Sequence, residues 1–203
     1  WRSPTAFRVD PVGDSHWRSL LGCLAPAGSD VAVFDITSDL GIPAFMALID
    51  DASGTTGAPE LGSGAHPAPE VALARALTEA AQARATFIAG AREDIPDADY
   101  KAAALDERRR TARAILDGLQ PARSFSAITS VERPSFAGDI EATLEALARA
   151  GLGQVLTVDV GKPAFGFAVV RVVVPGLEAA LEGPRSAYVP GRRAAALLQE
   201  VAA

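Results

Sequence analysis

The sequence is poor in cysteine, histidine and aromatic residues, and each shortage excludes a class of site or core. A single cysteine, Cys23, rules out an intrachain disulfide, and we interpret it as a small buried hydrophobe. The two histidines, His16 and His66, take part in no Ser-His-Asp, Cys-His or zinc-ligand spacing. Aromatic residues make up 6% of the chain, so alanine, valine and leucine must supply most of the core.

The chain also lacks a long uninterrupted apolar run and an excess of positive charge. Its longest apolar stretch, "FGFAVVRVVVPGL", is broken by Arg171 and Pro175 and is too short to span a bilayer. The opening "WRSPTAFRVD" has no apolar signal-peptide core. A net charge of −6 argues against a general nucleic-acid binder, although a small anionic ligand responds to the local field instead. We therefore expect a cytoplasmic protein with neither membrane nor nucleic-acid partners.

What the chain does have is apolar material for a sizeable core, because 49% of its residues are hydrophobic and 22% are charged. Runs rich in β-branched residues predict strands over 31–37, 44–50, 154–160 and 166–176. Helical patterns cover 69–89, 96–119, 138–151 and the C-terminal tail. Residues 50–70, rich in glycine and proline, predict a long loop. This order predicts an α+β fold, with mixed or antiparallel sheets and helices packed on one side.

The helix predicted over residues 69–89 has two distinct faces. Four polar side chains, which we call the polar stripe, lie within roughly 60° of one another at about 100° per residue: Arg75, Glu79, Gln82 and Thr86. The apolar face is formed by Leu73, Leu77, Ala80 and Ile88, and is extended by Ala76 and Phe87. Arg84 falls on the apolar side, where a charge must be paired or reach an edge. We predict that Arg84 is buried against a carboxylate, a phosphate site or backbone carbonyls.

The polar stripe allows two interpretations. As a solvated helix face, it needs only an Arg75–Glu79 pair worth about 0.3–0.5 kcal/mol. As a binding site, it presents the Glu79 carboxylate to Mg²⁺, a hard cation that prefers oxygen ligands. The amide of Gln82 or a guanidinium would then orient phosphate oxygens. Periodicity alone favours the solvated face.

The segments on either side of this helix add weaker signals. The glycines of "GSGAHP" (62–67) could bring backbone N–H groups to an anion, but the stretch matches neither the P-loop nor the GxGxxG fingerprint. His66 is more typical of a turn than of a ligand. Arg92, just past the helix end, either satisfies terminal carbonyls or binds a ligand. In the helix predicted over 96–119, the alternating charges of "DERRRTAR" (106–113) predict a solvated surface. Asp97 or Asp99 is expected to cap the beginning of this second helix.

One long stretch, "GSGAHPAPEVALARALTEAAQARATFIAGAREDI", combines a Gly-rich approach, a helix of the form R-A-L-T-E-x-x-Q-x-R and a G-x-R-x-D ending. The pattern falls on Arg75, Ala76, Leu77, Thr78, Glu79, Gln82 and Arg84, followed by Gly90, Arg92 and Asp94. This stretch resembles the YcaO family. The segment "VFDITSDLGIPAF" resembles the family's strand-Asp-x-Thr-x-x-x-Gly-x-Pro segment. The pieces "VVRVVVPGLE" and "YVPGRRA" resemble the C-terminal region of members that work with a TfuA-type partner.

The resemblance implies ATP-dependent activation of a peptide backbone amide. In YcaO proteins a nucleophile attacks the amide, phosphate is attached to its oxygen, and the phosphate is then expelled. A Cys, Ser or Thr side chain as nucleophile gives an azoline, and sulfide, in members paired with TfuA, gives a thioamide. The family's ATP lies on Mg²⁺ ions held by glutamates, which assigns Glu79 to the metal. The resemblance assigns four residues to the ATP site, in this order: Glu79, Gln82, Arg84 and Arg75.

The resemblance covers essentially all 203 residues, as the C-terminal half of one YcaO-like domain. Two glutamate-bearing helices of the family, S-x-x-x-E-x-x-E-like and E-x-x-x-E-R-like, are absent. The chain therefore contains one of the three helices that form the walls of the family's ATP/Mg²⁺ site, and we expect it to be inactive alone.

The tail lacks the proline-rich terminus of many azoline-forming members, which favours thioamide formation on a peptide or protein substrate with a TfuA-like protein. Two alternatives stay open: an azoline-forming cyclodehydratase, and a non-catalytic module that binds a leader peptide or a partner protein. The oligomeric state also stays open, with a homodimer as one alternative.

Overall fold

The computed structural model describes residues 5–8, 29–51, 58–90, 93, 95–117, 123–177 and 191–202. Four residues considered above lie outside the described residues: His16, Cys23, Arg92 and Asp94. The chain divides into two compact units, Ser3–Ser135 and Phe136–Ala203 with Trp1–Arg2, and each is described by itself.

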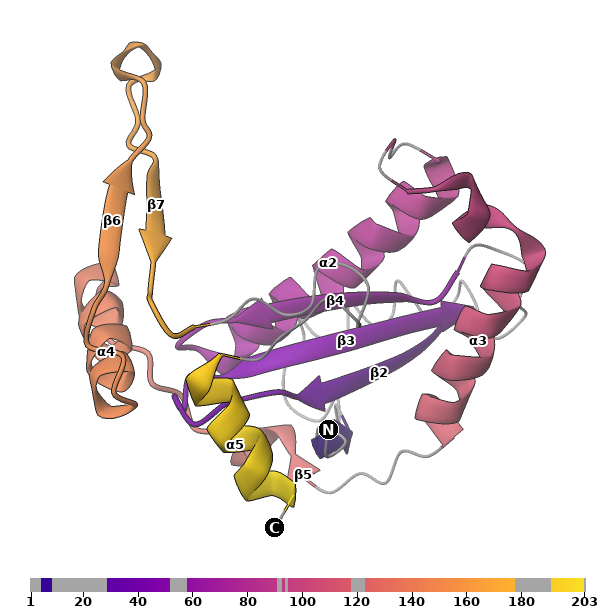
Figure 1. Ribbon diagram of the computed structural model, residues 1–203, viewed down its shortest axis with the longest axis horizontal. Helices are drawn as coiled ribbons and strands as arrows, with labels where there is room; N and C mark the ends of the chain where they lie inside the picture. The colour runs from indigo at the N-terminus through magenta and orange to yellow at the C-terminus, as the bar shows by residue number, and fades with distance from the viewer. Residues whose placement is uncertain are drawn as a thin grey trace. The chain divides into compact units, whose positions relative to one another are not determined.

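The larger unit is built on a five-stranded sheet with the order β4-β3-β2-β1-β5 (Figure 1). Its strands are β1 (Thr5–Arg8), β2 (Ser29–Asp35), β3 (Ala44–Asp51), β4 (Glu60–Ala65) and β5 (Arg123–Ser124). The pairs β1–β2, β2–β3 and β3–β4 are antiparallel, whereas β1 and β5 run parallel. The sheet is therefore mixed, which confirms the predicted fold class.

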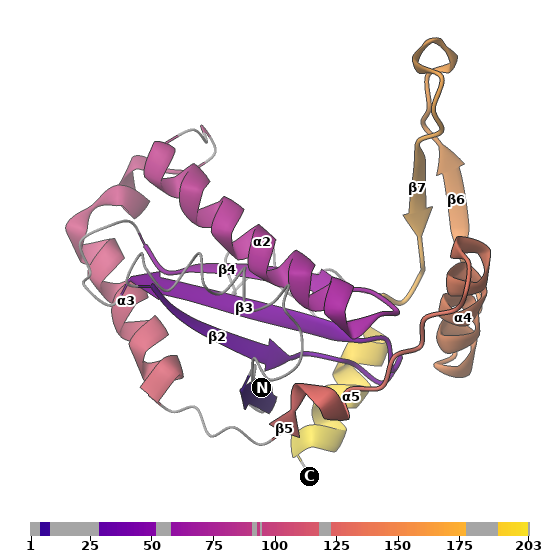
Figure 2. The same cartoon turned by 180° about the vertical axis from the view of Figure 1, so that it is seen from behind.

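The described helices of this unit follow the fourth strand. The long helix α2 (Pro69–Ala89) runs across the sheet, over β3 and β4 (Figure 2). Proline stands at its beginning, where a missing N–H costs nothing, and Gly90 ends it with a left-handed φ of 59°. The chain continues through the 3₁₀ turn η2 (Asp97–Tyr100), the helix α3 (Ala102–Asp117) and the turn η3 (Phe125–Ala127).

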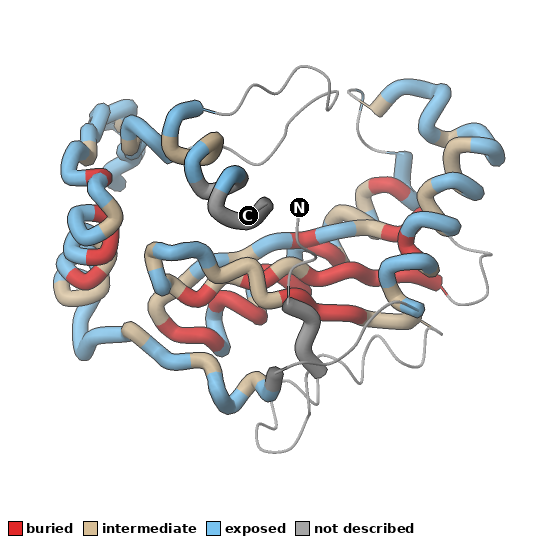
Figure 3. The backbone as a smooth tube through the Cα atoms, turned by 60° about the horizontal axis from the view of Figure 1, so that its bottom comes forward, coloured by how far each residue is buried: buried red, intermediate tan, exposed pale blue. Residues whose placement is uncertain are grey.

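Two apolar layers hold the helices to the sheet because successive strand residues face opposite sides. On one side, Val33, Phe45, Ala47 and Ile49 pack against Leu73, Ala76, Leu77 and Ala80 of α2. On the other side, Ala32, Phe34 and Leu48 pack against Ala112 of α3. Figure 3 shows this buried backbone along the central strands and α2. The helices thus lie on both faces, which corrects the prediction that they pack on one side.

Two consecutive aspartates at the end of β3 follow the same alternation. Asp51 lies on the α2 side, where its Oδ2 atom is 3.8 Å from Nη2 of Arg84. Asp50 lies on the α3 side, where its Oδ2 atom is 3.4 Å from Nε of Arg113. Both aspartates are buried, so each buried negative charge has a cationic neighbour from a different helix.

The smaller unit contains α4 (Phe136–Arg149), the hairpin of β6 (Leu156–Asp159) and β7 (Val170–Val173), the turn η4 (Pro163–Phe165) and α5 (Arg192–Ala202). Both strands of the hairpin are shorter than predicted. All eight residues of the two strands are exposed, so no buried apolar contacts stabilise a longer pairing between them. None of the described helices combines the length and apolar character needed to cross a membrane.

Three local predictions are wrong. The predicted loop 50–70 contains β4, which pairs with β3 despite its two glycines. Ile88 is exposed rather than part of the apolar face, because it lies at the end of α2. Neither Asp97 nor Asp99 caps the second helix: both belong to η2, and α3 begins at Ala102.

Candidate functional site

Two glycines bring the backbone of β4 against the backbone of α2. A Cβ atom at Gly62 would collide with the Ala80 nitrogen and the Ala76 oxygen, and one at Gly64 would collide with the Ala72 oxygen. Only glycine fits positions where backbone approaches backbone this closely. The glycines of "GSG" therefore fix the contact between strand and helix, in place of the anion-binding loop that their composition suggested.

Two residues of the polar stripe cover the open edge of β4, which ends the sheet on this side. The Glu79 Oε2 atom accepts hydrogen bonds from the Ser63 N–H at 3.0 Å and from its hydroxyl at 3.4 Å. One turn earlier, Nη1 of Arg75 lies 3.5 Å from the Ala65 carbonyl oxygen. The Glu79 carboxylate thus accepts from an N–H of the strand edge, and the Arg75 guanidinium donates to a C=O of the same edge. Both contacts disfavour pairing of this edge with another strand.

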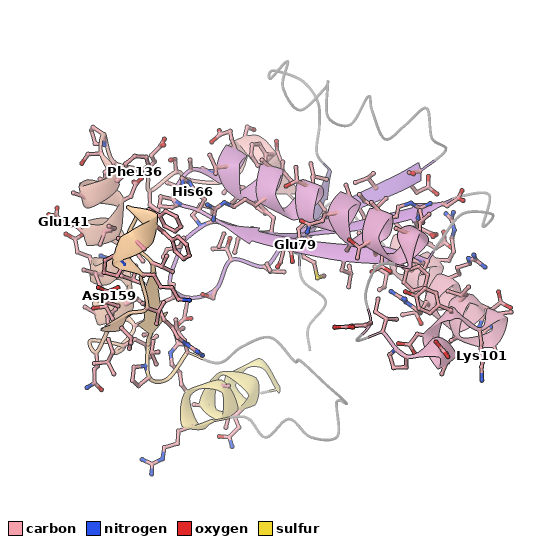
Figure 4. All side chains as sticks on the ribbon, turned by 90° about the horizontal axis from the view of Figure 1, so that it is seen from above. His66, Glu79, Lys101, Phe136, Glu141 and Asp159 are labelled. Atoms are coloured by element: carbon pink, nitrogen blue, oxygen red, sulfur yellow. The ribbon has the colours of Figure 1, made fainter. Side chains whose placement is uncertain are left out.

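Three of the four residues of the polar stripe line a hollow of about 540 Å³, and Arg75 is not among its described lining residues. Glu79, Gln82 and Thr86 face it from successive turns of α2, and Glu60 of β4 faces it too. Ala83, Phe87 and Ile95 complete the lining among the described residues. Figure 4 shows Glu79 about midway along α2, with His66 near the beginning of the helix. A carboxylate and an amide one turn apart therefore open onto one hollow, as the binding interpretation of the stripe requires.

Glu60 joins this hollow to a second one of about 420 Å³, which is also lined by Asp99, Ala104, Glu107 and Arg108. The Glu60 Oε1 atom lies 2.8 Å from Nη2 of Arg108, which also donates to the Pro59 carbonyl at 3.1 Å. Burial raises the pKa of Glu60, and the charges of Arg108 and Arg84 oppose this rise. The stretch 106–113 is therefore more than a solvated surface, since Arg108 and Arg113 pair with carboxylates of the sheet.

One aromatic residue, Phe87, lines both of these hollows. Phe87 stacks on Tyr100 with a centroid distance of 4.5 Å, and the Arg108 guanidinium lies 5.2 Å from the Phe87 centroid. The Tyr100 hydroxyl is buried and has no hydrogen-bond partner among the described residues. These two contacts hold the Phe87 ring, which lines both hollows, in place.

Arg84 is largely buried against a carboxylate and a backbone carbonyl, as predicted, with 12% of its side chain exposed. Besides the Asp51 carboxylate, it reaches the Ala58 carbonyl, at 3.3 Å from Nη1. It is not among the described residues that line the hollow. Of the four candidate residues, Glu79 and Gln82 share the hollow, Arg75 lies one turn from Glu79, and Arg84 faces elsewhere.

His66 is a turn residue. Its Nδ1 atom accepts the Ala68 N–H at 3.0 Å, and its own N–H donates to the Pro43 carbonyl at 3.1 Å. These bonds fix the connection between β4 and α2, and they support the turn interpretation of this histidine.

The donors available at the stripe suit a hard cation. Glu79 offers the carboxylate atom Oε1 beside its hydrogen-bonded Oε2, and Gln82 offers an amide group. Within the described ranges, no group of three His, Cys, Asp or Glu could hold a metal by itself. Magnesium keeps several waters and takes phosphate oxygens as further ligands, so a single carboxylate fits it as part of a larger ligand set.

Sequence patterns missed Ser63, Glu60 and Arg108. Ser63 carried a weak signal, because it stands between two glycines immediately before the helix. Glu60 and Arg108 carried none, since they are brought together only when α3 folds back over the end of β4.

Comparison with known proteins gives one family. Residues 2–178 match the family described as YcaO cyclodehydratase, ATP- and Mg²⁺-binding. A protein of Methanothermobacter thermautotrophicus is 38% identical over 154 residues, which is 75% of this chain and 40% of that protein. A Rhizobium leguminosarum bv. trifolii protein named for the tfuA 3' region is 32% identical over 188 residues, which is 87% of this chain and 44% of that protein. The chain thus spans less than half the length of these relatives.

Solved structures share the fold. The heterocyclase TruD aligns with a TM-score of 0.68 at 27% identity, over 87% of this chain and 24% of that one. The YcaO protein of Methanopyrus kandleri, whose structure is bound with AMPPCP and Mg²⁺, aligns with a TM-score of 0.65 at 22% identity. This second alignment covers 85% of this chain and 45% of that one.

Proposed function

Because this chain belongs to the YcaO family, we propose that it forms part of an ATP- and Mg²⁺-dependent enzyme that activates a peptide backbone amide by phosphorylation. The family match over residues 2–178 confirms the resemblance found in the sequence. One observation supports assigning the ATP site to particular residues: Glu79 and Gln82 line the same hollow of about 540 Å³. A solvated helix face would not require such a hollow.

In this proposal the stripe forms one wall of the ATP site. Glu79 supplies a carboxylate oxygen to Mg²⁺, which when bound neutralises phosphate charge. Gln82 orients phosphate oxygens through its amide. Arg75 is the nearer phosphate-facing cation, since its guanidinium lies on the same edge as Glu79. Arg84 is committed to Asp51 and the Ala58 carbonyl, so it ranks after Arg75 as a phosphate ligand.

We further propose that the product is a thioamide, formed with a TfuA-like partner on a peptide or protein substrate. Support comes from the relative named for the tfuA 3' region. The similarity to a heterocyclase at 27% identity favours azoline formation as the second candidate. Mass spectrometry of the treated peptide separates the two, because one product replaces oxygen by sulfur and the other loses water.

The experiment that tests the ATP site is Glu79→Gln in the longest protein that the gene encodes. We expect ATP turnover and peptide modification to be abolished while the circular dichroism spectrum stays unchanged. Glu70→Gln is the matched control, because Glu70 is an exposed glutamate in the first turn of the same helix. Wild-type turnover in the Glu79→Gln variant would refute the assignment of Glu79 to the ATP site.

We also propose that residues 1–203 alone do not complete the site. The described residues supply one carboxylate from the stripe and no group of three metal-binding side chains. Titration calorimetry should detect no saturable ATP·Mg²⁺ binding to this chain and saturable binding to the longest protein that the gene encodes. Tight binding of ATP·Mg²⁺ to residues 1–203 would refute the proposal that further segments are needed to complete the ATP site.

A further inference from the structure

Ser63 is placed so that it donates hydrogen bonds to one carboxylate oxygen of Glu79 and not to the other. Its N–H and its hydroxyl both donate to Oε2, at 3.0 Å and 3.4 Å. No bond to Oε1 accompanies them among the described residues. A carboxylate fixed through one oxygen keeps its second oxygen in a defined position.

The position of Ser63 is itself fixed from both sides. Gly62 and Gly64 lie against the backbone of α2, where any side chain would collide. Because successive strand residues alternate, the Ser63 side chain leaves the strand on the side opposite to Gly62 and Gly64, and its hydroxyl and N–H both meet the Glu79 carboxylate at the open edge of β4. The edge is therefore held in register with the turn of α2 that carries Glu79.

We propose that Ser63 is the positioning residue for the metal-binding carboxylate of Glu79. This inference rests on the proposed function, since it assumes that Glu79 binds Mg²⁺. It assigns the "GSG" segment a role of its own, in which the glycines set the distance between strand and helix and the serine sets the orientation of the carboxylate. In this role Ser63 acts through Glu79 and requires no contact of its own with nucleotide or metal.

The test measures Mn²⁺ binding without nucleotide by electron paramagnetic resonance, in the longest protein that the gene encodes. Ser63→Ala removes the hydroxyl and keeps the N–H, so we expect the lower end of the usual effect on metal affinity, about tenfold weaker. Ser63→Thr retains a hydroxyl and should restore wild-type affinity. Ala65→Ser is the matched control, because it adds a hydroxyl at the next position on the same exposed side of β4.

A structural role alone would move a different quantity. It would lower the melting temperature of Ser63→Ala and leave Mn²⁺ affinity unchanged at temperatures where the protein is folded, and this result would overturn the proposal. KM for ATP·Mg²⁺ should rise in Ser63→Ala, with a smaller change in kcat.

The Glu79→Gln variant distinguishes failure of the Ser63 proposal from failure of the proposed function. If Glu79→Gln weakens Mn²⁺ binding and Ser63→Ala does not, the role of Ser63 is wrong and the proposed function stands. If neither variant weakens binding, Glu79 is not a metal ligand, and both proposals fail.

Discussion

Arg84 of α2 meets Asp51 at the end of β3, with 3.8 Å between Nη2 and Oδ2 and only 5% of the aspartate side chain exposed. Arg84 lies on the apolar side of its helix, and the partner that this position demands is a buried carboxylate together with the Ala58 carbonyl. The contact joins the long helix to the second strand from the edge of the sheet.

We expect Arg84→Ala to lower the free energy of unfolding by about 3 kcal/mol, because it leaves a buried negative charge without its cation. Urea unfolding followed by circular dichroism measures the change. Arg110→Ala, which removes an exposed arginine of α3, should alter stability by less than about 0.5 kcal/mol. Equal effects of the two substitutions would show that the Asp51 contact contributes nothing specific.

Gly62→Ala should lower the free energy of unfolding by about 3 kcal/mol, because the added Cβ meets the backbone of α2 and neither backbone can yield locally. Gly153→Ala provides the contrast. A Cβ there meets no atom within 4 Å, and its effect should be neutral or slightly stabilising. Unfolding curves of both variants decide the matter, and an unaffected Gly62→Ala would mean that α2 is not held this closely to β4.

The raised pKa of Glu60 predicts a pH dependence with a definite sign. The folded state binds the proton more tightly than the unfolded state, so this group's contribution to stability falls as the pH rises from about 4.5 through the folded pKa. Above that pKa the contribution is constant. In urea unfolding from pH 4 to pH 8, the stability difference between wild type and Glu60→Gln should change only across that interval.

Glu70→Gln controls for the loss of one negative charge, because Glu70 is exposed. A difference between wild type and Glu60→Gln that stays constant from pH 4 to pH 8 would contradict the burial of Glu60.

Tyr100→Phe should raise the free energy of unfolding by about 1 kcal/mol, because the buried hydroxyl has no partner among the described residues and its removal relieves a desolvation cost. The stacking on Phe87 is kept. Phe87→Ala, by contrast, removes a buried ring and should cost about 3 kcal/mol. Thermal melting of both variants would show the opposite signs, and a destabilised Tyr100→Phe would reveal a hydrogen bond to the hydroxyl.

The sequence was sufficient to place α2, because local features determine both of its ends. Proline at its start, an alanine-rich interior and Gly90 at its end predict the span 69–89, which the structure has as Pro69–Ala89. The strand β4 could not be predicted in the same way. Its residues Glu60–Ala65 include two glycines and no β-branched side chain, so pairing with β3 and contact with α2 must form it.

In the candidate site, too, the features set by local sequence were predictable and those set by tertiary contacts were not. Periodicity puts Glu79 and Gln82 on one face of a helix, and the family resemblance gives them a ligand, but neither reveals a hollow. The hollow depends on Glu60 and Ile95, which other segments bring to the stripe. The partner of Arg84 was predictable as a class of group, and its identity depended on how the end of β3 meets the helix.

The two aspartates at the end of β3 also discriminate between alternative strand pairings. If β3 slipped by one residue toward its own beginning, Asp51 would move to the α3 side and Arg84 would lose its carboxylate. The same slip would turn Phe45, Ala47 and Ile49 away from α2. An incorrect register would therefore separate the largely buried Arg84 from the Asp51 carboxylate as well as expose the core, and this double penalty favours the native register during folding.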